Sequence, residues 1–248
     1  MSGIVKRLKR AYQKSAVFNF NVVERDAWVA RQAESLPAGS CILDAGAGSC
    51  PYRSLFAHCD YKAQDFTSLQ GEQLSGGEYG TIDYVCDIAA IPVEDATFDA
   101  VLCSEVIEHV PDPVAVMAEF GRIIKPGGRL ILTAPLGSGI HQEPYHFYGG
   151  YTPFWYEKVL SEKGFTDISV QANGGSLKAF AQEALRFVHM TMPFSGILPF
   201  FISLLWFPFW LLLLPILAGL IPVAAHLLDR FDTEQHFSVG YFITAVKG

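Results

Sequence analysis

The segment CILDAGAGSCP (residues 41–51) carries the clearest structural signal in this sequence. A short apolar run that ends in glycines is typical of a buried parallel strand that enters a tight loop. Gly46 and Gly48 let the backbone pass close to a ligand. Pro51 suits the first position of a helix, and the free N–H groups at such a helix start bind carboxylates and phosphates. The segment therefore predicts a nucleotide-binding strand, loop and helix.

Strand and helix patterns alternate around this segment. Helices are predicted at 21–39, 112–128 and 152–165, where proline or a capping residue marks the start and glycine marks the end. Further short strands are predicted at 61–66, 82–88, 98–106, 128–135, 166–172 and 238–246. We therefore expect an α/β fold with a Rossmann-like, doubly wound and mostly parallel seven-stranded sheet.

Two kinds of nucleotide-binding loop compete for the glycine segment. A dinucleotide site requires G-x-G-x-x-G, but the residue three beyond Gly48 is Pro51, so this pattern fails. The order of Asp44, Gly46 and Gly48 instead resembles the acidic-x-G-x-G-x-G pattern of class I S-adenosylmethionine-dependent methyltransferases of the type 11-like kind, with Cys50 in place of the third glycine. The resemblance implies the class I methyltransferase fold and S-adenosyl-L-methionine as the cofactor.

Further motifs extend this resemblance over roughly residues 20–170 and the closing strand. Asp65 follows Asp44 by 21 residues, at the end of the second predicted strand, where one carboxylate can accept both ribose hydroxyls. The segment CDIAAIPVEDATFDAV resembles the family's adenine-binding turn, which places Asp87 at the exocyclic amine and Ile88 at the ring face. The cofactor-binding set that the resemblance implies is Asp44, Gly46, Ala47, Gly48, Asp65, Phe66, Asp87, Ile88, Ser104 and Glu105.

Three histidines are candidates for the general base. Methyl transfer from a sulfonium is an in-line displacement, and an oxygen nucleophile needs a base to take its proton. His109 follows a predicted strand, at a position where similar methyltransferases often have a Glu–His pair. His141 and His146 lie in GSGIHQEPYHFYGGYT, which emerges at the carboxyl edge of the sheet. His141, Glu143 and His146 could also ligate an ion, but no cysteine or second acidic cluster joins them, and we predict no metal.

The overall composition bounds the partners and the compartment. A net charge of -7 argues against nucleic-acid binding, which depends on phosphate neutralisation. Five cysteines without a C-x-x-C pair fit free thiols in a reducing cytoplasm, and we find no secretory signal pattern. One exception to the acidic balance is the basic run IVKRLKRAYQK (residues 4–14), which could lie on an anionic membrane surface.

A long apolar segment stands between the last two predicted strands. From Phe187 to Leu228 there is no Asp, Glu, Lys or Arg. Both strands belong to one sheet, so the segment must leave and return on one side of any membrane, and a single crossing is excluded. Two crossings need about 20 apolar residues each plus a turn, which this run barely supplies. Five prolines favour short broken helices that dip into one leaflet, with Trp206 and Trp210 in the interfacial zone. The prolines are Pro193, Pro199, Pro208, Pro215 and Pro222.

We expect four regions along the chain. Residues 1–18 form a basic N-terminal segment, 19–175 the methyltransferase core, 176–236 a hydrophobic helical insertion that associates with a membrane, and 237–248 the final strand of the core. The alternatives for the insertion are a buried helical subdomain or an oligomer interface. A run this apolar would leave an exposed patch far larger than is usual on a soluble monomer, which favours the membrane.

The insertion emerges beside the predicted active site, where a lipid could present its head group. We therefore expect a membrane-associated enzyme at the cytoplasmic face that O-methylates a lipid-linked acceptor, such as a glycolipid or a polyprenyl-linked sugar. The segments HQEPYHFYGGYTPFWYEKVLSEKGF and DRFDTEQHFSVGYFITAVKG resemble bacterial methyltransferases linked to surface-polysaccharide pathways. A quinone or other prenylated ring is the alternative acceptor, and a catalytically inactive membrane-docked scaffold is the alternative to an enzyme. An oligomer is also compatible with the sequence.

Overall fold

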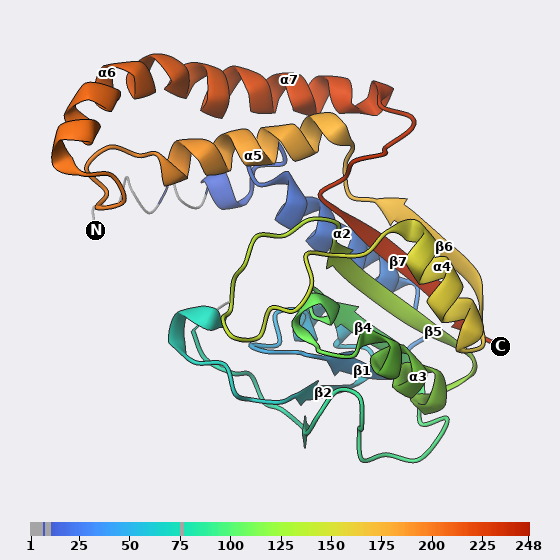
Figure 1. Ribbon diagram of the computed structural model, residues 1–248. Helices are drawn as coiled ribbons and strands as arrows, with labels where there is room; N and C mark the ends of the chain where they lie inside the picture. Colours follow the sequence, from blue (N-terminus) through green and yellow to red (C-terminus); the bar gives the residue numbers. More distant parts are fainter. Residues whose placement is uncertain (1–6, 8–10, 75–76) are drawn as a thin grey trace. The chain divides into compact units, whose positions relative to one another are not determined.

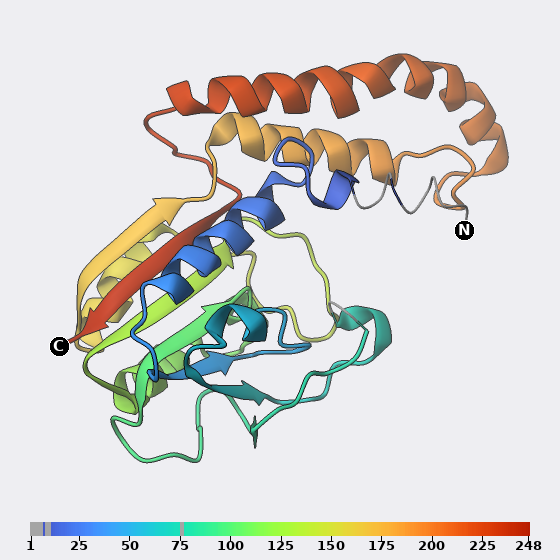
Figure 2. The same ribbon diagram turned by 180° about the vertical axis from the view of Figure 1, so that it is seen from behind.

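The computed structural model describes the chain except for residues 1–6, 8–10 and 75–76 (Figures 1 and 2). Most of the predicted basic N-terminal run lies outside the described residues. The chain divides into two compact units. The sheet unit comprises Arg25–Gln171 with Gly240–Gly248, and the helical unit comprises Met1–Glu24 with Ala172–Val239.

A seven-stranded sheet forms the centre of the sheet unit, in the order β3-β2-β1-β4-β5-β7-β6. β1 pairs in parallel with both β2 and β4, and β7 pairs antiparallel to β5. This arrangement confirms the predicted Rossmann-like sheet, including the apolar insertion between its last two strands. The strands are β1 Cys41–Ala45, β2 Asp60–Asp65, β3 Tyr84–Val85, β4 Phe98–Ser104, β5 Ile124–Pro135, β6 Phe165–Ala172 and β7 Gly240–Lys247.

Helices cover both faces of this sheet. α2 (Phe20–Glu34) lies on the face opposite α3 (Pro113–Ile123) and α4 (Pro153–Glu162) (Figures 1 and 2). Trp28 of α2 stacks on Phe242 of β7, with ring centroids 5.0 Å apart. The apolar side chains of α2 join those of β1 and β4 in one buried cluster. The alternation of buried strands and amphipathic helices therefore produces the layered core that the sequence pattern predicts.

Two predicted helices differ from the observed ones. The glycine loop leads into a single 3-10 turn, η1 (Arg53–Phe56), and not into an α-helix starting at Pro51. α3 begins after Asp112, whose side chain accepts a hydrogen bond from the Ala115 N–H at 3.0 Å, but it ends at Ile123 rather than Gly127. The proline at position 126 disfavours helical backbone at the preceding residue, so the chain becomes extended and begins β5 there.

The apolar insertion forms a helical hairpin. α5 (Ser176–Met190) is followed by α6 (Phe200–Pro215), the π-helical turn η4 (Ile216–Leu220), α7 (Ile221–Leu228) and the 3-10 turn η5 (Asp229–Phe231). The prediction of short broken helices is wrong, because Phe200–Phe231 is one continuous helical stretch (Figure 1). Pro215 and Pro222 lack a backbone N–H group. The π turn between them changes the hydrogen-bond pattern locally, so the helix continues past both prolines. By length and composition alone, this is the one stretch of the described residues suited to crossing a membrane.

Hydrogen bonds close the hairpin at both ends. Asp229 accepts bonds from the backbone N–H groups of Gly175, at 2.8 Å, and Lys178, at 2.9 Å, at the start of α5. At the other end, the indole N–H of Trp206 donates to the Thr191 carbonyl at 3.0 Å, and that of Trp210 donates to the Val188 carbonyl at 3.1 Å. Both indoles thus satisfy their N–H groups within the hairpin and need no water.

Candidate active site

The glycine loop has the backbone shape that the sequence predicts. Gly46 has φ 73° and Gly48 has φ 51°, in the left-handed region that favours glycine. A Cβ atom at Gly46 would stand 2.5 Å from a methyl carbon of Val106, so no side chain fits there. Cys50, in place of the third glycine, is itself held at φ 54°. The backbone at the end of β1 is therefore free of side chains at positions 46 and 48.

Asp65 and Gln64 tie this loop to the end of β2. One carboxylate oxygen of Asp65 accepts the Gly48 N–H at 2.9 Å, and the other accepts the Thr67 N–H at 2.9 Å. The side-chain amide of Gln64 accepts from the Gly46 N–H at 3.2 Å and donates to the Cys86 carbonyl at 2.7 Å. Asp65 is therefore held rigidly, with its remaining lone pairs available to a ligand.

Asp44 lies at the end of β1 and is almost fully buried, with 3% of its surface exposed. Burial raises the pKa of Asp44 to about 7, although the Tyr61 hydroxyl donates to its Oδ2 at 2.5 Å and opposes this shift. The nearby Asp65 carboxylate raises the pKa further. A cation bound beside Asp44 would stabilise its ionised form.

The ionisation of Asp44 predicts a pH-dependent cofactor affinity. S-adenosylmethionine carries an ammonium and a sulfonium, and Asp44 must lose its proton to pair with a cation. We expect the Kd to be roughly tenfold lower at pH 8 than at pH 6, because a group with a pKa near 7 is mostly ionised only at the higher pH. Tyr61→Phe removes a bond that lowers this pKa and should shift the dependence to higher pH. Calorimetric titrations test this; an unchanged pH profile in Asp44→Asn would contradict it.

The predicted cofactor residues come together along one edge of the sheet. They follow the carboxyl ends of four adjacent strands, β3, β2, β1 and β4. In the loop after β3, Ile88 is buried and Asp87 is exposed. Phe66, after β2, packs edge-on against Tyr145, with ring centroids 5.1 Å apart. Ser104 ends β4, and its hydroxyl is 2.9 Å from that of Thr133 on β5. Ligands of doubly wound sheets bind at this edge, so these residues stay the predicted cofactor site.

Arg25 is a site residue that the sequence reasoning missed. Its guanidinium lies 3.6 Å from the Glu105 carboxylate and donates to the Tyr52 hydroxyl at 3.1 Å. Tyr52 in turn donates to Asp26 at 2.9 Å. The signal was available, because Arg25 stands three residues before Trp28 on the face of α2 that packs on the sheet. A partly buried cation bonded to Tyr52, just after the glycine loop, is suited to a carboxylate of the cofactor.

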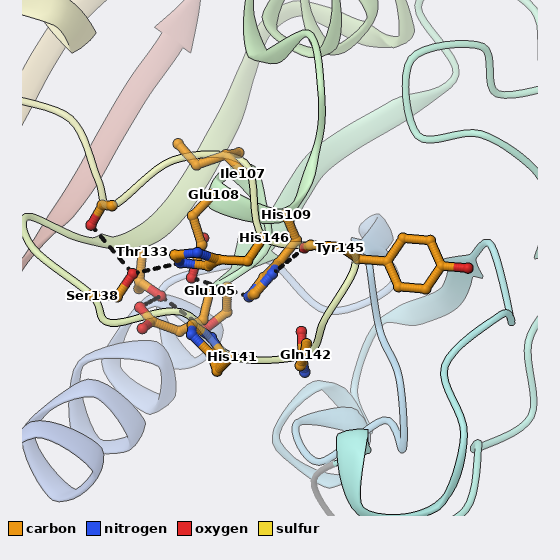
Figure 3. A network of polar contacts seen from close by, with 12 residues as sticks. Glu105, Ile107, Glu108, His109, Thr133, Ser138, His141, Gln142, Tyr145 and His146 are labelled. Carbon is orange, nitrogen blue, oxygen red and sulfur yellow. Dashed lines mark hydrogen bonds and ion pairs between the residues drawn. The ribbon is translucent and has the colours of Figure 1, made fainter.

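The three candidate histidines form one cluster in the sheet unit (Figure 3). His109 ends the short turn η3 (Ile107–His109) after β4, and the other two lie in the loop after β5. The ring centroids of His109 and His141 are 4.6 Å apart, and those of His141 and His146 are 4.7 Å apart. The loop is held against η3 by two backbone bonds, from the Phe147 and Tyr148 N–H groups to the Glu108 carbonyl, at 3.0 and 3.1 Å.

Hydrogen bonds define the tautomers of two of these rings. His109 Nδ1 is 2.6 Å from the Tyr145 carbonyl, and His141 Nδ1 is 2.8 Å from the Gly139 carbonyl. A carbonyl only accepts, so both Nδ1 atoms carry a proton, and in the neutral form of either ring the lone pair is on Nε2. His146 Nε2 is instead 2.9 Å from the Ser138 hydroxyl.

Burial keeps the charges of this cluster low. Burial lowers the pKa of His109 to about 4. The bond to the Tyr145 carbonyl raises this pKa, and the neighbouring His141 and His146 lower it further. Burial, with the Glu105 carboxylate, raises the pKa of Glu108 to about 8. The pKa of His146 is also lowered, by burial and by His141. At neutral pH His109 and His146 are therefore mostly unprotonated imidazoles, which can accept a proton.

Sequence comparisons find similarity to methyltransferases around this edge. Residues 43–132 match a family described as "Methyltransferase domain". The ubiquinone biosynthesis O-methyltransferase of Xanthomonas axonopodis pv. citri is 36% identical over 104 residues, which cover 39% of this chain and 44% of that relative. A sarcosine/dimethylglycine N-methyltransferase of Halorhodospira halochloris is 28% identical over 167 residues, covering 60% of this chain and 58% of the relative. The chain thus spans less than two thirds of these relatives.

Solved structures share the fold over nearly the whole chain. An S-adenosylmethionine-dependent methyltransferase from Archaeoglobus fulgidus has a TM-score of 0.53 at 14% identity, covering 98% of this chain and 99% of that one. Phosphoethanolamine N-methyltransferase 2 of Haemonchus contortus, in complex with S-adenosylmethionine, has a TM-score of 0.53 at 17% identity, covering 96% and 56%. The fold is thus that of the class I methyltransferases. Residues 43–132, less than half of the chain, carry the match to the family described as a methyltransferase domain.

Proposed function

We propose that this protein is a membrane-docked methyltransferase that transfers a methyl group from S-adenosylmethionine to a lipid-linked acceptor at the cytoplasmic face. The observation that carries the proposal is the apolar helical hairpin inserted into a methyltransferase sheet. The hairpin connects β6 to β7, and Gly240 at the start of β7 pairs with Pro135 at the carboxyl end of β5. The insertion therefore joins the sheet at the edge from which the histidine loop departs.

The side chains of the long helix support lipid as its surroundings. Large apolar residues are exposed along its whole length, for example Phe201 at 78%, Leu205 at 73% and Leu212 at 70%. A helix that binds one protein partner has one apolar face, whereas α6 is apolar on all sides. The hydrocarbon of a bilayer can contact all sides of such a helix, whereas a single protein surface covers only one side.

The lengths and charges of the hairpin support docking in one leaflet. The stretch Phe200–Phe231 has 32 residues and a helical path of roughly 48 Å at about 1.5 Å per residue, but it bends near its start and is not one straight span of the ~30 Å hydrocarbon core (Figure 1). α5 carries Glu183 and Arg186, which form an ion pair at 3.4 Å with half-exposed side chains. An antiparallel partner helix with these charges is poorly suited to cross the bilayer beside the long helix. Because both of its ends join one sheet, the hairpin is better suited to enter and leave the bilayer on the same side.

The chemistry of the site suits an oxygen acceptor. The acceptor oxygen attacks the methyl carbon, the carbon–sulfur bond breaks with its electron pair on sulfur, and S-adenosylhomocysteine leaves. The proton of the oxygen passes to an imidazole of the histidine cluster and then to solvent. Positioning of the two reactants supplies much of the rate.

His146 is the histidine for which we predict the largest effect on proton transfer. Its ring is oriented by the Ser138 hydroxyl, and its lowered pKa leaves it unprotonated at neutral pH. We expect His146→Ala to lower kcat by roughly 10²–10⁴-fold, the usual contribution of a general base, with an unchanged Kd for S-adenosylmethionine. Single-turnover kinetics measure this, with the exposed His58→Ala as control. An unchanged kcat in His146→Ala would remove His146 from the mechanism.

Two acceptor classes share the lipid anchor. A glycolipid or polyprenyl-linked sugar is the acceptor that the loop and C-terminal segments favour. A prenylated ring is favoured by the similarity to ubiquinone biosynthesis O-methyltransferases. Presenting each class in liposomes with methyl-labelled cofactor distinguishes them by which lipid becomes labelled. Protein that binds neither cofactor nor acceptor would instead favour the inactive scaffold.

A further inference from the structure

The strongest feature beyond the proposed function is a group of three side chains with metal-ligand chemistry at η3 and the loop after β5 (Figure 3). One ligand atom each of Glu108, His109 and His141 lies within 4.8 Å of the other two. We propose that these residues bind one divalent transition-metal ion, with Zn²⁺ the best-suited ion. The proposal does not depend on the acceptor or on methyl transfer.

Glu108 has a buried carboxyl oxygen without a hydrogen-bond partner among the described residues. Its side chain is 1% exposed, and its Oε2 atom has no hydrogen-bond partner among the described residues. The neighbouring Glu105 is compensated by Arg25 at 3.6 Å and by the Thr133 hydroxyl at 2.9 Å. The Nε2 atom of His109 lies 3.7 Å from Oε1 of Glu108, which is too far for a hydrogen bond. A buried carboxylate oxygen without a partner is costly unless a cation or a donor occupies the space beside it.

His109 and His141 are oriented in the same way, through their Nδ1 atoms. Both donate Nδ1–H to a backbone carbonyl, of Tyr145 for His109 and of Gly139 for His141. This is the arrangement that orients ligating histidines, because it fixes the tautomer and leaves Nε2 for the metal. His146 is held by Ser138 and is not a member of the trio, so it stays available as a base.

The spacing and donor types define the ion. Donors around one tetrahedral ion stand roughly 3.4 Å apart for bond lengths of about 2.1 Å. His141 lies on an exposed loop and can close the remaining gap by a small movement of its side chain. Two imidazoles and one carboxylate suit Zn²⁺ and similar ions, whereas Mg²⁺ prefers oxygen ligands only. Such a site keeps open positions, where a bound hydroxyl would lose its proton more readily.

This proposal replaces the sequence-based expectation of no metal. The sequence suggested His141, Glu143 and His146 as the only set to consider, because these residues are close in the chain. The structure groups His141 with Glu108 and His109, which precede it by more than thirty positions. The fold, and not local spacing, creates the set.

Metal binding by the purified full-length protein tests the site directly. The protein is stripped with a chelator and titrated with Zn²⁺ against a chromogenic chelator, and with Co²⁺ while its visible spectrum is recorded. We expect one Zn²⁺ per chain, a Co²⁺ spectrum with nitrogen and oxygen ligands, and no competition from equimolar Mg²⁺. His109→Gln, His141→Gln and Glu108→Gln should each weaken Zn²⁺ binding at least tenfold, whereas the exposed His58→Gln should not.

Folding and cofactor controls keep the outcome clear. Thermal unfolding and S-adenosylmethionine binding are measured for every variant. If Glu108→Gln does not fold, His141→Gln decides, because its side chain is exposed. Zn²⁺ binding below one ion per chain in the parent protein, or undiminished binding in His141→Gln and His109→Gln, would overturn the proposal. Either result leaves cofactor binding and methyl transfer to be judged separately.

Discussion

Replacement of Asp65 by alanine is expected to weaken S-adenosylmethionine binding at least 100-fold. Asp65 holds the backbone of Gly48 and Thr67 through both carboxylate oxygens, and it is the predicted acceptor for the ribose hydroxyls. Charge-assisted hydrogen bonds to a buried carboxylate are among the stronger polar contacts. Loss of the side chain removes these bonds and loosens the loop.

Asp60→Ala is the matched control for this prediction. Asp60 begins the same strand whose other end is Asp65, and its contacts there are with Lys62 and Cys41 at the edge away from the glycine loop. We expect its Kd for S-adenosylmethionine to stay within twofold of the parent value by calorimetry. Equal Kd values for the Asp60→Ala and Asp65→Ala variants would contradict the assignment of the cofactor to the carboxyl edge of the sheet.

A triple replacement on the long helix is expected to release the protein from membranes. Phe201, Leu205 and Leu212 are each at least 70% exposed, and we expect Phe201→Asp, Leu205→Asp and Leu212→Asp together to lower liposome partitioning more than 100-fold. Each buried aspartate costs about 2.5–3.5 kcal/mol at the bilayer centre and less near the interface. Flotation on a density gradient measures the bound fraction.

Conservative changes at the same positions control for altered packing. Phe201→Leu, Leu205→Ile and Leu212→Ile keep the apolar surface, so the bound fraction should stay unchanged. Cofactor affinity should be the same in both triple variants, because the cofactor residues lie in the sheet unit. Flotation of the aspartate variant to the same extent as the conservative one would exclude the hairpin as the anchor.

Sequence patterns predicted the parts of this protein that depend on local chemistry. Glycines at 46 and 48 after an apolar run are enough to predict the loop after β1. Glycine adopts the left-handed backbone there without the steric strain that other residues would have. Short apolar runs that alternate with helical patterns predicted all seven strands and the position of the insertion. The order of motifs then placed the candidate cofactor residues at one sheet edge.

Features that depend on tertiary packing were not accessible in this way. Prolines at 208, 215 and 222 read as helix ends, yet the remaining backbone bonds and a π turn carry the helix through them. Arg25 gained its importance only when α2 packed on the sheet beside Glu105. Glu108, His109 and His141 became a possible ligand set only when the loop after β5 closed over η3.

We expect this chain to methylate a lipid with the methyl group of S-adenosylmethionine. The most direct test incubates full-length protein in liposomes containing a bacterial lipid extract with deuterated-methyl cofactor, and then analyses the organic phase by mass spectrometry. We predict one lipid species that gains the labelled methyl group, and no product from protein carrying Asp65→Ala. Cofactor binding without label in any lipid, or label only in water-soluble products, would contradict lipid methylation by this chain.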